Sequence, residues 1–252
     1  MHQADRMSAI LDRLAASGSL SVAQTASELG VSEATIRRDL ERLEEQRLLS
    51  RTHGGAVAQS VLYELPLRYR SARRQDEKLR IARATLELIG EARTIGLTGG
   101  TTTSEVARSL VERSRITVVT NALNIASELA VRPTIKLVLT GGVARSESYE
   151  LVGPLAERTL ATLNLDVAIV GADGVDLVAG VTTHHEVEAH TNAALIERAR
   201  RVILVADSSK IGQAAFAQIC PLAAVHELVT DRDAPASVLA AMRESGIAVT
   251  VV

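Results

Sequence analysis

Apolar residues recur at the spacing of an α-helix in two stretches near the start of the chain. The first stretch places them at positions 7, 10, 11 and 14, and the second at positions 36, 40 and 43. Residues three and four apart lie on one side of a helix, so each stretch predicts a helix with a single apolar face. Ser32 is placed to cap the second helix, because its hydroxyl can accept from the unpaired amides of the first turn. The segment between them, residues 19–30, predicts a shorter helix that ends at Gly30.

The exposed face of the helix that follows Ser32 carries groups that suit DNA. At about 100° per residue, Ala34 and Arg38 lie opposite the apolar face, and Thr35 and Arg37 flank it. A small residue, a hydroxyl and two guanidiniums fit a major groove, where Arg can bond guanine in two places. Arg and the helix amides can also hold phosphate. We therefore expect the recognition helix of a helix-turn-helix protein, against the alternative that both arginines form only a solvated helix face.

A short hairpin is predicted directly after that helix, with one strand on either side of Gly54 and Gly55. The two glycines permit a tight reversal of the chain. Arg51 and His53 at the tip are placed to touch the DNA backbone or the minor groove. Residues 1–58 are thus predicted to form a winged helix-turn-helix DNA-binding domain.

A change of pattern follows at residues 59–80, which break the helical spacing and contain Pro66. This segment is predicted to be a linker that enters a helix. It concentrates the cations Arg68, Arg70, Arg73, Arg74, Lys78 and Arg80. Some of them can add phosphate contacts, but a solvated helix face accounts for most of them.

From residue 81 to residue 252, short apolar runs alternate with helical patterns. The runs are TIGLTGG, ITVVTN, TIKLVLTGG, LDVAIVGADG, RRVILVADSSK, VHELVTD and IAVTVV. Helices are expected between them, for example over residues 186–199 and 236–244. Strands separated by helices imply parallel βαβ units, and short β-branched runs suit strands buried on both faces. The predicted fold class is therefore α/β, with the winged helix-turn-helix domain followed by a doubly wound, mostly parallel α/β domain.

The composition excludes several classes of protein. At 252 residues with 46% hydrophobic residues, the chain suits two globular domains. It has no Trp and one Phe, so stacking on single-stranded nucleic acid is disfavoured. The lone Cys220 has no partner for a disulfide or a metal site, which fits a reducing cytoplasm. Because no signal peptide and no apolar run of about 20 residues is found, we expect a soluble cytoplasmic protein without a membrane partner.

The charge is divided unevenly along the chain. The formal net charge is −2, but residues 1–83 hold 14 Lys and Arg against 11 Asp and Glu, and residues 84–252 hold 14 against 19. A modest positive excess near the start is compatible with specific contact from a local patch. It does not supply a strong field for non-specific DNA binding.

Candidate ligand chemistry lies in the loops after the strands, because ligands of such sheets bind outside the carboxyl ends of the strands. The first loop contains two glycines, which let a backbone approach closely, and several hydroxyls before a helix start. Amides and dipole at a helix start stabilise an anion such as phosphate. The sequence lacks GxxxxGK[ST] and GxGxxG there, and a helix merely capped by Thr and Ser is the alternative. The candidate residues are Thr98, Gly99, Gly100, Thr101, Thr102 and Thr103.

Later loops add groups that suit a polyol phosphate. They contribute Asn121, Gly141, Gly142, Asp173 and Lys210. A carboxylate such as Asp173 can accept from sugar hydroxyls, and an ammonium such as Lys210 can neutralise phosphate. No cofactor and no metal site is expected, because HHEVEAH lacks a His at position 189 and so departs from HExxH. His184 and His185 could still line the pocket.

Two sets of motifs resemble the DeoR family of bacterial transcription regulators. VSEATIRRDLERLEEQRLLSRTHGGA is similar to the N-terminal signature of that family. TGGTTTSEVA, VVTNAL, LVGPLAERTL, DVAIVGADGV and VADSSKIG are similar to its sensor domain, which in turn looks like the fold of ribose 5-phosphate isomerase. The resemblance implies that residues 81–252 are a sugar-phosphate-isomerase-like effector-sensing domain. It also implies the roles of single residues, which are a phosphate loop at Gly100, Thr101 and Thr102, a pocket wall at Asn121, a hydroxyl acceptor at Asp173 and an anion contact at Lys210.

Two positions depart from the family pattern. Thr98 stands where family members often carry Asp, and Asn192 stands where many carry Lys. Both departures bear on which phosphorylated compound the pocket takes.

The expectation from residues and resemblance together is a DNA-binding regulator and not an enzyme. It would repress a sugar or carbohydrate catabolic operon, and a phosphorylated sugar or related metabolite would modulate its binding to operator DNA. A homo-oligomer, dimer or tetramer, is expected, because two reading heads match two half-sites. The alternative is a sugar-phosphate isomerase with Asp173 as general base and Lys210 as electrostatic partner. That alternative is disfavoured, because an isomerase of this fold would need more than one carboxylate near the reacting carbons and the GADG loop offers only one.

Overall fold

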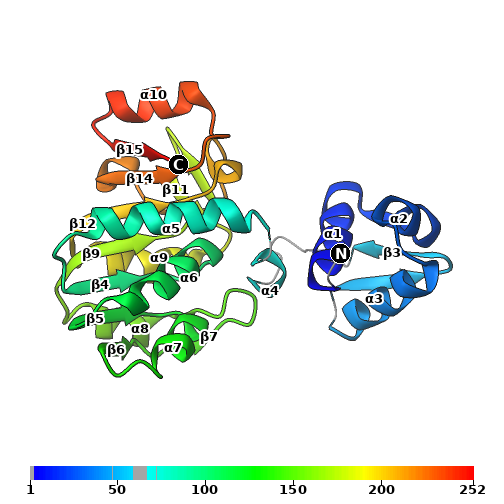
Figure 1. Ribbon diagram of the computed structural model, residues 1–252, viewed down its shortest axis with the longest axis horizontal. Helices are drawn as coiled ribbons and strands as arrows, with labels where there is room; N and C mark the ends of the chain where they lie inside the picture. The colour runs from blue at the N-terminus through cyan, green and yellow to red at the C-terminus, as the bar shows by residue number, and fades with distance from the viewer. Residues whose placement is uncertain (1–2, 47, 59–66, 72) are drawn as a thin grey trace. The chain divides into compact units, whose positions relative to one another are not determined.

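The chain forms two compact units, Met1–Arg73 and Arg74–Val252, in a computed structural model that describes residues 3–46, 48–58, 67–71 and 73–252 (Figure 1). The linker was predicted over residues 59–80. Its part from 59 to 66, with Pro66, lies outside the described residues. Within the rest, residues 67–70 and 75–80 are helical, so much of the predicted linker has regular structure.

The first unit has the predicted helices, with their apolar faces turned inward. Ile10, Leu14, Ile36, Leu40 and Leu43 are each no more than 1% exposed. The elements are α1 (Gln3–Ser17), β1 (Ser19–Ser21), α2 (Val22–Leu29), α3 (Glu33–Glu45), β2 (Leu49–Thr52), β3 (Gly55–Ala58) and α4 (Leu67–Arg70).

The predicted hairpin is part of a three-stranded sheet in the order β1-β3-β2. Residues Ser19–Ser21, which were expected to belong to the first helix of the turn motif, instead form β1 and pair with β3. Gly55 allows this pairing, because a Cβ on it would lie 2.0 Å from the carbonyl oxygen of Leu20. Strand β3 of the wing is therefore paired on both sides, with β1 and with β2.

A buried ion pair joins α1 to α3, the predicted recognition helix. Asp39 on α3 is 1% exposed, and its carboxylate accepts from the guanidinium of Arg6 at 2.5 and 3.2 Å. The Asp39 partner raises the pKa of Arg6. This pair, which the sequence pattern did not reveal, holds α3 in place from behind its exposed face.

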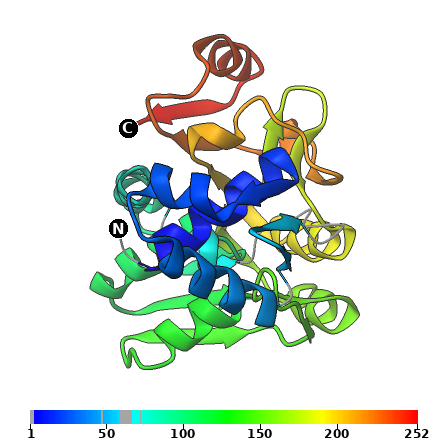
Figure 2. The same cartoon turned by 90° about the vertical axis from the view of Figure 1, so that its right-hand side faces the viewer.

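The second unit contains a seven-stranded parallel sheet in the order β15-β14-β12-β9-β4-β5-β6. Figure 2 shows the C-terminal β15 (red) at one edge of this sheet and the green segment around β6 towards the other. The strands are β4 (Thr94–Leu97), β5 (Ile116–Thr120), β6 (Ile135–Leu139), β9 (Leu165–Val170), β12 (Ala199–Val205), β14 (Glu227–Thr230) and β15 (Ala248–Val251). The predicted doubly wound, mostly parallel α/β fold is confirmed.

Helices cover both faces of the sheet. Along β9, Val167 and Ile169 join the apolar cluster that includes α5, α6 and α7, while Ala168 and Val170 join the cluster that includes α8, α9 and α10. This alternation is the period of two that a strand imposes. The helices are α5 (Gln75–Ile89), α6 (Thr101–Ser109), α7 (Leu123–Leu129), α8 (Pro154–Leu160), α9 (Glu186–Ile196) and α10 (Ala236–Glu244), with short 3-10 turns η1 (Leu110–Glu112), η2 (Ser208–Lys210) and η3 (Leu222–Ala224).

Five short strands of the second unit lie outside the seven-stranded sheet. They form a pair, β7 (Val143–Ala144) with β8 (Leu151–Val152), and a small antiparallel sheet of β10 (Gly174–Asp176), β11 (Gly180–Thr183) and β13 (Ala217–Cys220). Helix α9 ends at Ile196 and not at the predicted residue 199, because Ala199 already pairs with Leu165 in the sheet. In the part of the chain that the structure describes, no helix has the length and apolar character needed to cross a membrane.

Candidate functional site

The start of α3 is capped as predicted. The Ser32 hydroxyl accepts from the backbone amide of Thr35 at 3.2 Å, and its oxygen also lies 2.9 Å from Oγ1 of Thr35. Ala34 is exposed beside them. The first turn of α3 therefore presents a small residue and hydroxyls at a helix N-terminus, where the amide dipoles favour phosphate.

The two arginines of α3 differ in their surroundings. Arg37 donates to Glu33 one turn earlier at 2.6 Å, and both side chains are about half exposed. Arg38 is exposed as well, and no described residue binds its guanidinium. An exposed ion pair contributes little stability, so Arg37 can exchange Glu33 for a phosphate at small cost. Arg38 can bind DNA without giving up a partner.

The wing presents the other predicted DNA-binding residues. His53 and Gly54 lie in its exposed turn, and Gly54 has a φ of +102° that favours glycine. Arg51 lies on β2, where its amide donates to Glu44 at 2.8 Å and its guanidinium lies 3.6 Å from Glu41. Two carboxylates therefore surround Arg51 in the free protein.

In the second unit, the order in which strands join the parallel sheet changes side between β4 and β9. From β4 the sheet continues through β5 and β6 to one side, and from β9 through β12 to the other. A crevice forms outside the carboxyl ends of strands at such a switch point. We call the residues that follow the ends of β4, β5, β9 and β12, together with the side chains bonded to them, the polar rim.

Thr98 ties β4 to β9 at this point. It is fully buried, its amide donates to the carbonyl of Ile169 at 3.2 Å, and its hydroxyl accepts from the amide of Gly171 at 3.0 Å. A Cβ on the neighbouring Gly99 would lie 2.3 Å from Oε1 of Glu150. Thr98 thus holds the ends of β4 and β9 together, and Gly99 leaves room for the side chain of Glu150 beneath the rim.

The loop then enters α6 through Gly100, whose φ is +129°. Its carbonyl accepts from the hydroxyl of Thr103 at 3.0 Å and from that of Ser104 at 2.7 Å. Among the residues that the structure describes, no side chain is found to cap the amides of the first turn of α6. Those amides, with Thr101 and Thr102 beside them, keep the anion-binding character that the sequence predicts.

Asn121 lies at the end of β5 and brings two further residues to the rim. Its side-chain amide donates to Glu150 at 3.1 Å and to Asn192 at 3.3 Å, and Asn192 also donates to Glu150 at 3.3 Å. All three residues are at most 4% exposed. The Oδ1 atom of Asn121 has no hydrogen-bond partner among the described residues.

Asp173 and Lys210 meet on the rim, as predicted, with 3.9 Å between the ammonium and the carboxylate. Oγ1 of Thr183 lies 3.0 Å from Oδ2 of Asp173 and 3.3 Å from Oε2 of Glu188, so one hydroxyl links two carboxylates. Arg145 in turn donates to Glu188 at 2.5 Å. Two carboxylates and two cations of the rim are therefore linked in one network.

Burial raises the pKa of Glu150 to about 8, and the negative charges of Glu188 and Asp173 act in the same direction. Hydrogen bonds from Asn121 and Asn192 oppose this effect only partly. At position 192, where the sequence departs from the family pattern, the hydrogen-bond donor beside Glu150 is an uncharged amide. The carboxyl group of Glu150 is therefore mostly protonated near neutral pH.

The sequence reasoning missed Glu150, Glu188, Arg145 and Thr183. Glu150 and Arg145 lie in the β7–β8 region, where no element was predicted, and Glu188 lies in the motif that was tested only for metal binding. Gly142, by contrast, serves packing, because a Cβ on it would lie 2.8 Å from the carbonyl of Val152. His185 caps α9 by accepting from the amide of Val187 at 3.3 Å.

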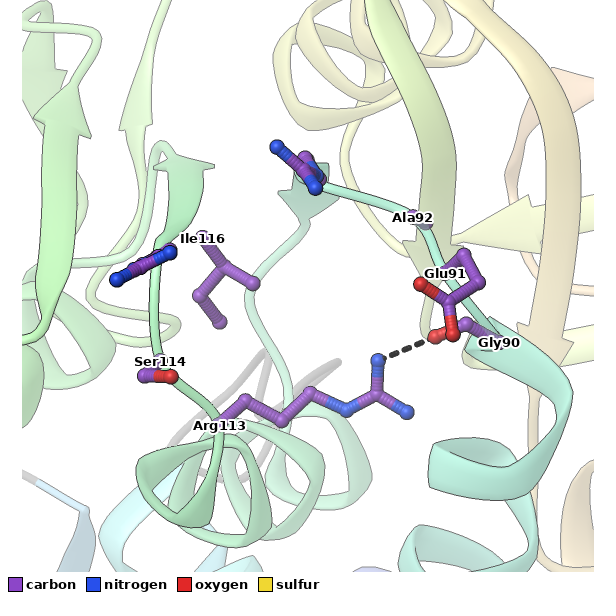
Figure 3. A pocket seen from close by; sticks show the side chains of 8 residues that line it. Gly90, Glu91, Ala92, Arg113, Ser114 and Ile116 are labelled. Atoms are coloured by element: carbon purple, nitrogen blue, oxygen red, sulfur yellow. Dashed lines mark hydrogen bonds between the residues drawn. The ribbon is translucent and has the colours of Figure 1, made fainter.

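A separate cavity of about 340 Å³ lies at the amino ends of the strands, before β4 and β5 (Figure 3). None of the predicted rim residues, all of which the structure describes, lines it. Arg113 points across it and donates to the carbonyls of Gly90 at 2.6 Å and Leu86 at 2.7 Å, at the end of α5. Arg113 thus satisfies backbone carbonyl groups at the C-terminal end of α5. The cavity is lined by Gly90, Glu91, Ala92, Arg93, Arg113, Ser114, Arg115 and Ile116.

Comparison with known proteins bears on both units. A DeoR-like helix-turn-helix domain matches residues 6–61, and a DeoR C terminal sensor domain matches residues 73–232. The chain belongs to the DeoR family. The resemblance noted in the sequence is confirmed, and the recognition helix and the polar rim lie on the two domains of a DeoR-family protein.

Relatives of this DeoR-family protein match it over nearly its whole length. The glycerol-3-phosphate regulon repressor of Escherichia coli (strain K12) is 34% identical over 98% of this chain and 98% of the relative. The transcriptional regulator GlpR of Haloferax volcanii is 35% identical, over 99% and 98%. The transcriptional repressor GlcR of Bacillus subtilis (strain 168) is 34% identical, over 92% and 90%. A solved D-ribose-5-phosphate isomerase aligns with 54% of this chain and 54% of its own at 22% identity, with a TM-score of only 0.40.

Proposed function

We propose that this DeoR-family protein is a cytoplasmic repressor of a carbohydrate catabolic operon and that a phosphorylated sugar or polyol modulates its binding to operator DNA. The carrying observation is the joint presence, in one chain, of a capped recognition helix with an unpaired Arg38 and a polar rim that combines unpaired helix amides with Lys210 and Asp173. Full-length relatives that are named as repressors support the same conclusion.

In the DNA-binding unit, the roles follow from the surroundings of each residue. Ser32, Thr35 and the amides of the first turn contact phosphate, Ala34 leaves room for a base pair, and Arg38 bonds a base edge. Arg37 leaves Glu33 for a phosphate. The wing residues Arg51, His53 and Gly54 form the second contact with the backbone or the minor groove. Gly55, which was predicted to join them, is buried against β1 and supports the wing from within the sheet. A homodimer or tetramer supplies two recognition helices for two half-sites.

In the sensor unit, the phosphate of the effector lies against the start of α6 and takes Lys210 as its counter-ion. The hydroxyls of the effector bond Asp173 and the amides of Asn121 and Asn192. Glu150, when protonated, offers a hydroxyl donor in place of a charge. The absence of lysine at position 192 favours an effector that needs only one side-chain cation at its phosphate.

The test is fluorescence anisotropy of a duplex from directly upstream of the protein's own gene, at two salt concentrations. Glycerol 3-phosphate, ribose 5-phosphate, fructose 6-phosphate and glucosamine 6-phosphate are then added in turn. Salt-sensitive binding in the nanomolar range that one compound weakens or strengthens supports the proposal. Absence of specific binding under all these conditions contradicts it.

Matched variants separate the two sites. Arg38→Ala should weaken specific binding by about 1–3 kcal/mol, whereas Arg37→Ala should chiefly lower the salt dependence. Lys210→Ala should weaken the response to the active compound without changing the affinity for the duplex alone. Equal effects of both arginine variants on specificity would contradict the assignment of a base contact to Arg38 and a phosphate contact to Arg37.

The structure gives the isomerase alternative one new observation, because Glu150 and Glu188 add carboxylates near Asp173. Both are already bound, Glu188 to Arg145 and Glu150 to two asparagines. An assay of purified protein with ribose 5-phosphate tests this alternative directly. Turnover that Asp173→Asn abolishes would favour an enzyme.

A further inference from the structure

Two consecutive arginines stand at the boundary between the two units. Arg73 is the last residue of the first unit and Arg74 is the first residue of the second. Arg73 donates from Nε to the hydroxyl of Ser8 at 3.1 Å and pairs with Asp12, and both partners lie on α1 of the DNA-binding unit. Arg73 is therefore held by the DNA-binding unit.

Arg74 is held by the sensor unit through a loop of the polar rim. Its guanidinium donates to the hydroxyl of Ser208 at 2.5 Å. It also lies 3.8 Å from Asp207, 3.7 Å from Asp231 and 3.9 Å from Asp233. Asp231 is 1% exposed and accepts from the amide of Ser208 at 2.6 Å, so Asp231 and Ser208 are held in place beside this guanidinium.

The backbone of Arg74 is strained in this position. It has a φ of +49° and a ψ of +41°, in the left-handed region, directly before the first turn of α5. A residue with a Cβ disfavours that region and remains there only where surrounding contacts hold it. Loss of those contacts would therefore let the backbone of Arg74 relax.

The contacts of Arg74 reach the polar rim through a single short turn. The 3-10 turn η2 comprises Ser208, Ser209 and Lys210. Its first residue bonds Arg74, and its last residue carries the ammonium that lies 3.9 Å from Asp173. A ligand phosphate that draws Lys210 away from Asp173 therefore acts on the turn that holds Arg74.

We propose that Arg74 is the positioning residue that couples the occupancy of the polar rim to the DNA-binding unit. This inference rests on the proposed function, because it takes the rim as the effector site. Movement of η2 releases the guanidinium, the strained backbone relaxes, and the change reaches Arg73, which is bonded to α1. By linkage, DNA bound to the first unit shifts the equilibrium of η2 by the same free energy.

The test measures hydrogen–deuterium exchange of the full chain with and without a duplex that the full-length protein selects from a random-sequence library. In the wild type, the duplex is expected to change deuterium uptake in residues 207–211. Arg74→Ala should abolish this change, and Arg74→Lys should restore part of it because the charge remains. Arg80→Ala, which removes an exposed arginine farther along α5, is the matched control and should retain the change.

A second arm uses the four sugar and polyol phosphates named above. Coupled sites change each other's affinity by roughly 5- to 150-fold, and Arg74→Ala should reduce the effect of the active compound on duplex affinity to less than about twofold. The affinity of that compound for DNA-free protein should stay within about threefold. A purely structural role would lower the melting temperature and leave the coupling intact.

Two results overturn the coupling role of Arg74. One is a wild-type protein whose residues 207–211 do not respond to the duplex, and the other is a response that survives in Arg74→Ala. Failure of the proposed effector is distinguishable, because then none of the four compounds changes duplex affinity although the response of residues 207–211 to the duplex persists.

Discussion

Glu150→Gln should change how the stability of the sensor unit depends on pH. The folded protein holds the pKa of Glu150 at about 8, against 4.5 for the group in an unfolded chain. Between these two values the folded state binds a proton that the unfolded state does not bind. The free energy of unfolding of the wild type therefore falls as the pH rises through this window, and the fall ends above the folded pKa.

The magnitude follows from the width of the window. One bound proton changes the free energy of unfolding by at most about 1.4 kcal/mol per pH unit. From about pH 5.5 to pH 7.5, the wild type should therefore lose up to about 3 kcal/mol relative to Glu150→Gln. At about 2–4 °C per kcal/mol for a unit of this size, the difference between the two melting temperatures should change by about 6–12 °C.

Thermal unfolding of the full chain, followed by circular dichroism at several pH values, measures this difference. Glu244→Gln on α10 is the control, because Glu244 is exposed and its replacement should leave the pH profile unchanged. Parallel profiles for the wild type and Glu150→Gln would refute the reasoning. They would mean that Glu150 is ionised in the folded protein and that its negative neighbours are neutralised in another way.

Three further predictions follow from packing and charge. Asp39→Ala should cost about 3–5 kcal/mol in urea unfolding because it leaves Arg6 buried without its partner, and a loss below 1 kcal/mol would contradict the role of this pair. Gly55→Ala should disrupt the pairing of β1 with β3, since its Cβ would lie 2.0 Å from the Leu20 carbonyl, and an unchanged amide spectrum of the wing would contradict this. Ser32→Ala should destabilise the first unit by about 0.5–2 kcal/mol through loss of the α3 cap, and equal stability in urea unfolding would count against the cap.

Local pattern was sufficient for much of the architecture. The spacing of Ile36, Leu40 and Leu43 predicted α3, and Ser32 predicted its start, because helix faces and caps depend on residues only a few positions apart. The alternation of apolar runs and helical stretches predicted the parallel sheet for the same reason. The short strands β7 and β8 escaped prediction, because two residues carry no periodicity.

The candidate site was predicted only in part. The carboxyl ends of parallel strands meet at one edge, so the pairing of Asp173 with Lys210 followed from topology. Glu150 could not be found in this way, since it reaches the rim from the connection after β6. The availability of Arg38 and the engagement of Arg37 by Glu33 depend on side-chain partners that a helical wheel alone does not rank.

By itself, the sequence determined the two domains, the recognition helix, the strand-end loops and the family, because these depend on local spacing and on motifs. Only the tertiary structure decided that Asp173 and Glu188 share one network, that Glu150 holds its proton near neutral pH, and that Arg74 bonds the turn carrying Lys210. The physical reason is that burial and charge at a sheet edge are sums over segments far apart in the chain. No local pattern contains those sums.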